Sequence, residues 1–207
     1  MKQSDRYIPA VGITGGVGSG KSVVMEILKE EFGAEVILAD LVAHDLMEPG
    51  AASYEQIVEE FGSGIVGADG QIDRPALSRI VFGDAARLER LNAITHPNVK
   101  KEILSRIEHF RKEGKASLIA VEAALLIEEG YEELLDALWY VYVSEENRIR
   151  RLMDGRGYSE EKSRSIMCQQ LPEEVFRRHC SRVIDNNSDV ESLRAQLKAI
   201  FQEEKWQ

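Results

Sequence analysis

The sequence predicts an α/β protein built on a parallel β-sheet with helices on both faces. Three observations lead to this prediction. The 207-residue chain is 43% hydrophobic and 30% charged, as folded globular domains are. Five short apolar runs are separated by amphipathic segments, the pattern of a parallel sheet covered on both sides. A glycine-rich stretch, GGVGSGKS (15–22), directly follows the first apolar run.

The elements follow in order along the chain. The apolar runs predict strands at 8–14, 35–40, 117–126, 137–144 and 182–186. Helical patterns occupy 22–32, 41–47, 51–61, 74–82, 84–95, 97–112, 145–170 and 190–201. Gly33 ends the first of these helices. The helices between 51 and 116 interrupt the strand–helix alternation, so we expect a helical insertion that contacts a substrate.

Composition excludes several classes of function. The net charge is −10 and the pI is about 5.0, which argues against general binding of nucleic acid or an anionic membrane. The N-terminal MKQSDRY is polar and the apolar run after it is short, so we expect neither a signal segment nor a membrane span. Cys168 and Cys180 match no zinc or redox motif, which indicates reduced thiols. We expect a cytoplasmic, monomeric enzyme.

The stretch GGVGSGKS fits G-x-x-x-x-G-K-[ST], the pattern of a phosphate-binding P-loop. Successive backbone N–H groups must point at an anion, and glycine permits the positive φ angles and the close approach. The helix that follows adds the positive end of its dipole. Lys21 is expected to reach the β and γ phosphates of ATP, and the Ser22 hydroxyl to bind Mg²⁺. The predicted ATP-binding residues are Gly16, Val17, Gly18, Ser19, Gly20, Lys21, Ser22 and Val23.

The P-loop occurs in several classes of protein, and other motifs separate them. A GTPase would carry N-K-x-D and a D-x-x-G after its third strand, and neither is present there. A multidomain ATPase or motor would be larger. The remaining class for a chain of this size is the small-molecule kinase.

Two carboxylates lie at or near the ends of predicted strands. Ligands of parallel sheets bind at the carboxyl ends of the strands, so both carboxylates are candidates for the site. Asp40 ends the second strand and is the candidate that orients and deprotonates an acceptor hydroxyl, although it could equally cap the next helix. Glu122 lies in the third strand and could hold Mg²⁺ through water, or form an ion pair with a lysine. Both alternatives stay open at this point.

An arginine-dense segment follows the fourth strand. A guanidinium matches phosphate oxygens, so such a segment suits a lid that closes over ATP and excludes water. One or two of its arginines are expected to be catalytic, and the others to be solvated. They are Arg148, Arg150, Arg151, Arg156, Arg164, Arg177, Arg178 and Arg182.

The chain resembles the dephospho-CoA kinase family over nearly its whole length. The resemblance rests on ITGGVGSGKS, ILADLVAHDLMEPG, DGQIDRPALSRIVF, LNAITHPNV, VEAALLIE, the R-L-M…SEEK…QLPEE segment and VIDNN. Departures are Leu38 in a segment where the family often has D-A-D, Ala124 at a frequent proline, Glu122 at a shorter acid, Gly155-Arg156-Gly157 in the lid, and Cys180-Ser181. The aspartate needed for catalysis, Asp40, is retained.

The resemblance implies transfer of the γ-phosphate of ATP to the ribose 3′-hydroxyl of dephospho-CoA, which gives coenzyme A and ADP. It implies a P-loop core (about 8–50, 117–145 and 182–207) with strand order 2-3-1-4-5, a CoA-binding insertion (51–116) and a lid (146–181), all in one domain. It suggests Asp40 as the base, Arg151 as a catalytic lid arginine and Asn186 near the adenine. It suggests Arg74 and His96 on the substrate side, and His96 could instead be structural.

Two rival functions remain. Another small-molecule kinase, such as a nucleoside monophosphate kinase, would need arginines for a monophosphate acceptor. A nucleotide-gated regulatory protein would bind nucleotide tightly without phosphoryl transfer.

Overall fold

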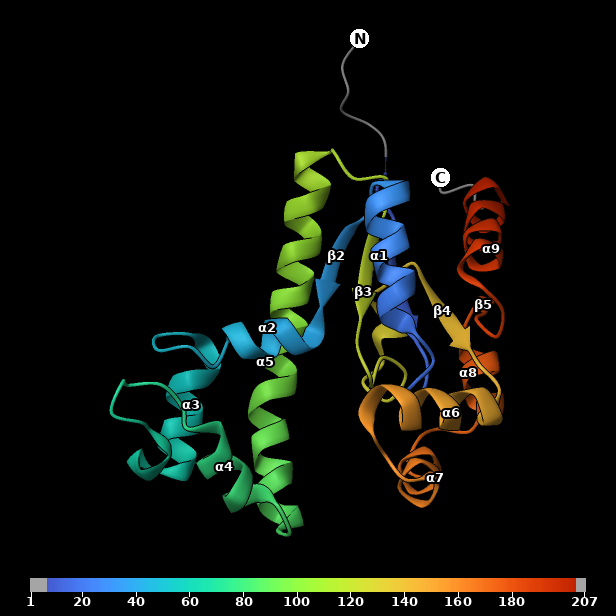
Figure 1. Ribbon diagram of the computed structural model, residues 1–207. Coiled ribbons are helices and arrows are strands. Elements are labelled where there is room, and N and C mark those ends of the chain that lie inside the picture. Colours follow the sequence, from blue (N-terminus) through green and yellow to red (C-terminus); the bar gives the residue numbers. More distant parts are fainter. Residues whose placement is uncertain (1–6, 204–207) are drawn as a thin grey trace. The chain divides into compact units, whose positions relative to one another are not determined.

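The computed structural model describes residues 7–203, so the expectation about the N-terminal segment lies almost entirely outside the described residues. The chain divides into two compact units (Figure 1). The sheet unit comprises the described residues up to Ile37 and those from Ile107 onward, and the helical unit is Leu38–Arg106. No helix in the described part of the chain combines the length and apolarity that crossing a bilayer requires.

The sheet unit contains a five-stranded sheet in the order β2-β3-β1-β4-β5, which confirms the predicted fold class. The strands are β1 (Ala10–Thr14), β2 (Glu35–Leu38), β3 (Ile119–Glu122), β4 (Ala137–Tyr142) and β5 (Arg182–Asp185). β1 pairs in parallel with β3 and with β4, and β4 pairs in parallel with β5. All five residues of β1 are buried, as expected for the central strand of a sheet covered on both faces.

Aromatic contacts identify the helices on the two faces of the sheet. Trp139 in β4 packs edge-on against Phe201 of α9 (Val190–Glu203), with ring centroids 6.2 Å apart. Its neighbour Tyr140 stacks on Phe176 of α8 (Glu173–His179), with centroids 4.7 Å apart. Consecutive strand residues point to opposite faces, so α9 and α8 cover opposite sides of the sheet. Phe32, at the end of α1 (Lys21–Phe32), stacks on the same Phe201 and joins α1 to the α9 layer.

The remaining helices of the sheet unit form the arginine-dense segment. They are α6 (Glu145–Arg156) and α7 (Glu160–Cys168), which precede α8, and a short 3₁₀ helix, η2 (Tyr131–Glu133), precedes β4. Ser144 and Ser159 cap α6 and α7 through their side chains, accepting hydrogen bonds from Asn147 and Lys162. The sequence shows both caps as Ser-Glu-Glu, with acidic residues in the first turn.

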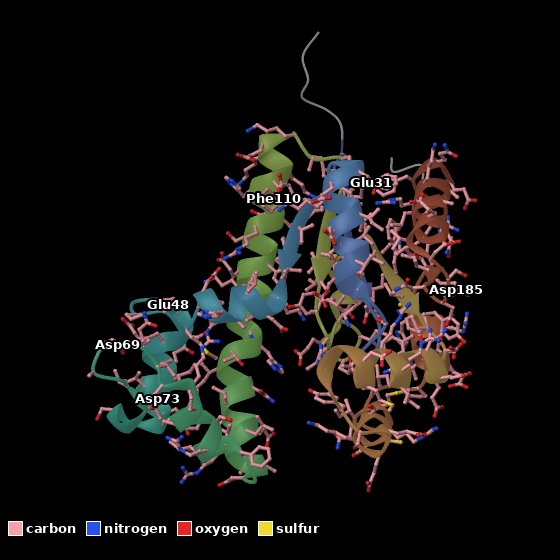
Figure 2. The ribbon with its side chains drawn as sticks, in the orientation of Figure 1. Glu31, Glu48, Asp69, Asp73, Phe110 and Asp185 are labelled. Carbon is pink, nitrogen blue, oxygen red and sulfur yellow. The ribbon has the colours of Figure 1, made fainter. Side chains whose placement is uncertain are left out.

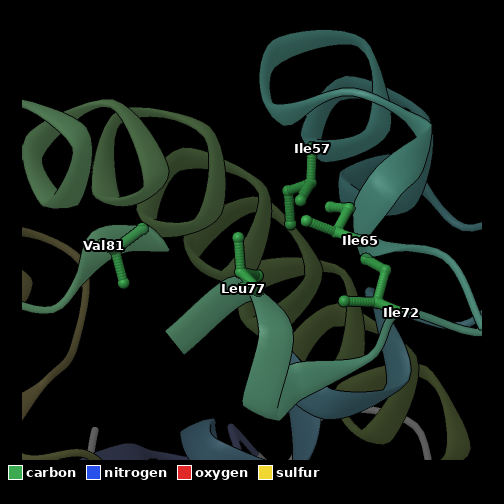
Figure 3. Close-up of a cluster of buried hydrophobic side chains, with 5 residues drawn as sticks. All are labelled: Ile57, Ile65, Ile72, Leu77 and Val81. Atoms are coloured by element: carbon green, nitrogen blue, oxygen red, sulfur yellow. The ribbon is translucent and has the colours of Figure 1, made fainter. Parts of the chain in front are cut away.

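The helical unit contains α2 (Ala39–Asp45), α3 (Ala52–Phe61), η1 (Ser63–Ile65), α4 (Arg74–Val81) and most of α5 (Ala85–Glu113). Its core is a cluster of buried side chains from three of these elements and the loop before α4 (Figure 3). The members are Ile57, Ile65, Ile72, Leu77 and Val81. Asp73 caps α4 by accepting a hydrogen bond of 2.9 Å from the Ala76 amide, and Figure 2 labels it beside that helix.

Several predicted boundaries are wrong. The stretch 145–170, expected to be helical throughout, contains two helices, α6 and α7, and α8 was not expected. The strand expected at 35–40 ends at Leu38 and α2 begins at Ala39, because Ala39 and Val42 are buried three residues apart, on one face of a helix. β3 stops at Glu122 instead of 126. The two helices expected at 84–95 and 97–112 are one helix, α5, with Pro97 inside it. Buried residues recur every four positions through the proline, at Thr95, Val99, Ile103 and Ile107, so packing outweighs the hydrogen bond that proline removes.

Gly12 in β1 provides a test of the core. A Cβ at this position would lie 2.5 Å from Leu138 Cδ2, 2.8 Å from Leu126 Cδ1 and 3.0 Å from Leu135 Cδ1. Gly12→Ala is therefore expected to lower the free energy of unfolding by about 1–3 kcal/mol. Urea denaturation measures it. In the control Gly155→Ala, nothing lies within 4 Å of the new Cβ, and stability should stay equal or rise by up to about 1 kcal/mol. Equal effects of both variants would contradict the tight packing at Gly12.

Candidate active site

The glycine-rich loop joins the buried end of β1 to the first turn of α1. Gly15, Gly18 and Gly20 have φ angles of 147°, 78° and 87°, which L side chains rarely adopt. Gly16 is needed for a different reason, since a Cβ there would lie 2.3 Å from Arg148 Nη2. Each of the four glycines is thus required by backbone conformation or by space. The loop ends at the N-terminus of a twelve-residue helix, where the dipole favours an anion.

Lys21 and Glu122 meet at this loop. The Lys21 ammonium donates a hydrogen bond of 2.8 Å to the Gly15 carbonyl and lies 3.8 Å from Glu122 Oε1. Glu122 ends β3, and its register partner in β1 is Ile13, so strand pairing brings the carboxylate to the loop. The two side chains are 14% and 25% exposed. The ion pair considered for Glu122 therefore exists, and its partner is the lysine of the loop.

Arg151 and Asn186 both hold the carbonyl oxygen of Ser19. The Asn186 amide donates to it at 2.8 Å, and Arg151 Nη1 lies 3.4 Å from it. Arg151 Nη2 also donates to the Asn186 carbonyl at 2.7 Å. Asn186 follows Asp185, the last residue of β5, labelled in Figure 2. Two residues distant in the sequence, both among the predicted site residues, thus meet at the loop.

Arg148 and Gln170 form a second contact with the loop, which the sequence did not reveal. Arg148 Nε donates to the Val17 carbonyl at 3.0 Å, and Nη2 donates to Gln170 Oε1. The same Gln170 oxygen accepts a hydrogen bond of 3.2 Å from the Val17 amide. Burial lowers the pKa of the Arg148 guanidinium from its ordinary value. The only signal in the sequence is the spacing of Arg148 and Arg151, three residues apart on one face of α6.

These contacts orient the backbone of the loop. The C=O and N–H of one trans peptide point in opposite directions. With the carbonyls of Val17 and Ser19 held on the side of α6 and Asn186, the N–H groups of Gly18 and Gly20 face the opposite way. The loop is thereby fixed with the amides of Gly18 and Gly20 directed away from α6, while the Val17 amide faces Gln170.

The structure distinguishes among the other arginines of this segment. Arg164 pairs with Glu145 and Glu160, Arg177 pairs with Glu173, and Arg182 lies 3.5 Å from Glu203. The side chains of Arg150, Arg156 and Arg178 are exposed. The expectation that most of these charges are solvated agrees with these positions. Of the eight arginines, Arg148 and Arg151 are the ones with hydrogen bonds to the loop.

The three residues expected on the substrate side lie in the helical unit, on three different helices. Asp40 is exposed in the first turn of α2, and it does not cap that helix, because Leu38 occupies the N-cap. Arg74 is exposed at the first position of α4. His96 is half-buried in the middle of α5 and not at the start of a helix, and this position agrees with the structural alternative as well as with a substrate contact. The loop residues, Glu122, Arg151 and Asn186 belong to the sheet unit.

The fold and the loop together define a P-loop kinase of the small-molecule class. A shikimate kinase from Acinetobacter baumannii shares the fold, with a TM-score of 0.52 at 16% identity over 94% of this chain and 92% of that one. The family model described as dephospho-CoA kinase matches residues 9–192. The chain belongs to the dephospho-CoA kinase family, whose ATP-dependent reaction completes coenzyme A biosynthesis, and this reaction is its function.

Individual relatives agree over nearly the whole chain. A dephospho-CoA kinase of Carboxydothermus hydrogenoformans is 41% identical over 96% of both chains. One from Moorella thermoacetica is 41% identical over 93% of this chain and 91% of its own. The solved dephospho-CoA kinase of Campylobacter jejuni has a TM-score of 0.70 at 28% identity, covering 94% of this chain and 96% of that one. The structure of TT1252 from Thermus thermophilus has a TM-score of 0.79 at 33% identity, covering 97% and 100%.

Asn186 offers a test of how the loop is held. In Asn186→Ala, the Ser19 carbonyl loses its hydrogen bond of 2.8 Å, so the loop should bind ATP more weakly. We expect the dissociation constant for ATP to rise about tenfold, in line with the loss of one well-made buried hydrogen bond. Isothermal titration calorimetry measures it. The control Ser188→Ala changes an exposed residue two positions on and should leave the constant unchanged. Unaltered affinity in Asn186→Ala would show that Asn186 does not support the loop.

Proposed function

We propose that this chain transfers the γ-phosphate of ATP to the ribose 3′-hydroxyl of dephospho-CoA with the residues described above. The observation that carries the proposal is the loop itself: four glycines, a lysine at its mouth, and two arginines that fix its carbonyls. In phosphoryl transfer the protein mainly positions the groups and stabilises charge. The loop amides and Lys21 bind the phosphates, and Arg151 stabilises the transferring group from α6.

Magnesium fits the oxygen donors present at the loop. The Ser22 hydroxyl is exposed at the second position of α1, and the Glu122 carboxylate lies 3.8 Å from Lys21 Nζ. A hydroxyl and a carboxylate are ligands that Mg²⁺ prefers in company with waters and phosphate oxygens. Ser22 would hold the ion directly and Glu122 through water. When bound, Mg²⁺ neutralises charge on the β and γ phosphates.

On the acceptor side, we assign Asp40 the role of the base. Its carboxylate is exposed in the first turn of α2, so it is accessible to an acceptor hydroxyl. Arg74 and His96 contact the CoA moiety, and Asn186 lies near the adenine. In this proposal the residues that bind the acceptor belong to the helical unit, and those that bind ATP belong to the sheet unit. The enzyme works as a cytoplasmic monomer on small molecules, without nucleic acid or membrane.

The test of the function is an assay of ADP release with ATP, Mg²⁺ and dephospho-CoA. AMP, adenosine and shikimate serve as parallel acceptors for the rival kinases. We expect turnover with dephospho-CoA alone and a product that carries a 3′-phosphate. Turnover with another acceptor would retain the kinase class and reject the proposed acceptor. ATP binding without transfer to any acceptor would favour a regulatory protein.

Asp40→Asn tests the proposed base. The amide keeps the size of the side chain but cannot accept the proton, so kcat should fall about 10²–10⁴-fold while the dissociation constant for ATP stays the same. Steady-state kinetics and calorimetry measure the two quantities. Asp45→Asn is the matched control, because it makes the same change on the same helix, where the Asp45 carboxylate pairs with Arg106 at 3.0 Å. A kcat close to the unmodified one in Asp40→Asn would remove Asp40 from this role.

A further inference from the structure

The side-chain oxygen of Gln170 lies between two donors of the phosphate-binding site. It accepts a hydrogen bond of 3.2 Å from the Val17 amide of the loop and another from the Arg148 guanidinium. Gln170 follows α7 and precedes α8, so it reaches the loop from the arginine-dense segment. A backbone amide and a guanidinium converging on one oxygen form the arrangement that phosphate oxygens take in nucleotide sites. The carboxamide oxygen thus has the surroundings of a phosphate oxygen.

Within residues 7–203, Arg148 forms no ion pair with a carboxylate, although the nearby charge of Glu145 favours its protonated form. Its side chain is half-buried, and among residues 7–203 no carboxylate oxygen approaches the guanidinium to within 4.0 Å. Arg164 and Arg177, in the same segment, are paired with glutamates. A partly buried charge without a counter-ion is unfavourable, and an anion at this position would relieve that cost. The Gln170 carboxamide offers only a dipole, so a phosphate would be a stronger partner.

The position of Val17 in the loop indicates which phosphate is involved. The amides at Gly20, Lys21 and Ser22 lie at the start of α1, where the helix dipole favours an anion, and we assign the inner phosphates to them. Val17 lies at the other arm of the loop, three residues before the N-cap. With the inner phosphates assigned to the start of α1, the terminal phosphate of a triphosphate is the one that would lie near Val17.

We propose that Gln170 holds the place of an oxygen of the terminal phosphate, that ATP displaces it, and that Arg148 then binds this phosphate. The inference rests on the proposed binding of ATP by the loop. It makes Arg148 and Gln170 the residues that distinguish ATP from ADP. Displacement of Gln170 also releases the turn between α7 and α8 from the loop, so that this segment responds to a triphosphate.

Variants of Gln170 test the displacement. In Gln170→Ala no side-chain oxygen competes with ATP, so the dissociation constant for ATP should fall about three- to tenfold while that for ADP changes less than about twofold. In Gln170→Glu a carboxylate pairs with Arg148 and resists displacement, and the constant for ATP should rise at least about tenfold. Calorimetry with ATP and with ADP measures both. The controls Gln169→Ala and Gln169→Glu alter an exposed neighbour and should leave the constants unchanged.

Variants of Arg148 test its contact with the phosphate. Arg148→Met should weaken ATP binding at least about tenfold more than ADP binding, so that the dissociation constant for ATP divided by that for ADP rises at least about tenfold. Arg148→Lys keeps the charge without the planar guanidinium and should raise this ratio less. Arg150→Met, an exposed residue on the same helix, is the control. Thermal unfolding of each nucleotide-free variant verifies that it is folded.

The outcomes separate this inference from the proposed function. An equal loss of ATP and ADP binding in Arg148→Met would mean that Arg148 only braces the Val17 carbonyl, and would overturn the inference. So would a Gln170→Ala variant that binds ATP no more tightly than the unmodified chain. Either result, together with normal turnover of dephospho-CoA, would leave the function intact. Failure of the unmodified chain to bind ATP would overturn both.

Discussion

The backbone conformation of residues 15–20 is the constraint on which the rest of the site depends. A phosphate-binding loop must keep several amides directed at one anion, and a free chain of glycines would not hold that shape because glycine loses much conformational entropy on folding. The structure supplies the missing restraint from outside the loop. Arg148, Arg151 and Asn186 bind the carbonyls of Val17 and Ser19, so the amides of the same peptides are directed the other way.

The loop and its supports require one another. A Cβ on Gly16 would lie 2.3 Å from the Arg148 guanidinium, and one on Gly20 would lie 2.3 Å from the Asn186 amide nitrogen. The glycines therefore make room for the side chains that fix them, besides permitting unusual φ angles. Asn186 is in place because β5 pairs with β4, and β4 with β1, from which the loop starts. The pairing of the strands thus determines where Asn186 lies relative to the loop.

The arginines of the arginine-dense segment differ in their surroundings. Some are exposed to solvent, and two contact the loop. Exposed arginines such as Arg164 and Arg177 are paired with glutamates on the surface, contacts that contribute little to stability. Arg148 and Arg151 are instead half-buried against the loop. For the triphosphate that we propose to bind here, partial desolvation strengthens the interaction with these two arginines, because the local dielectric is lower than that of water. An enzyme of overall charge −10 can in this way bind a polyanion at one small basic site.

The sequence by itself determined the features that depend on neighbouring residues. The order of glycines, lysine and serine identified the loop, the apolar runs identified the five strands, and the family motifs indicated the strand order that the sheet has. It could not determine where β2 gives way to α2, that α5 continues through Pro97, or that Arg148 and Gln170 reach the loop. These were decided by the tertiary structure, since each depends on which distant segment buries a residue. Eight arginines look alike in sequence, and only packing against Val17 and Ser19 sets two of them apart.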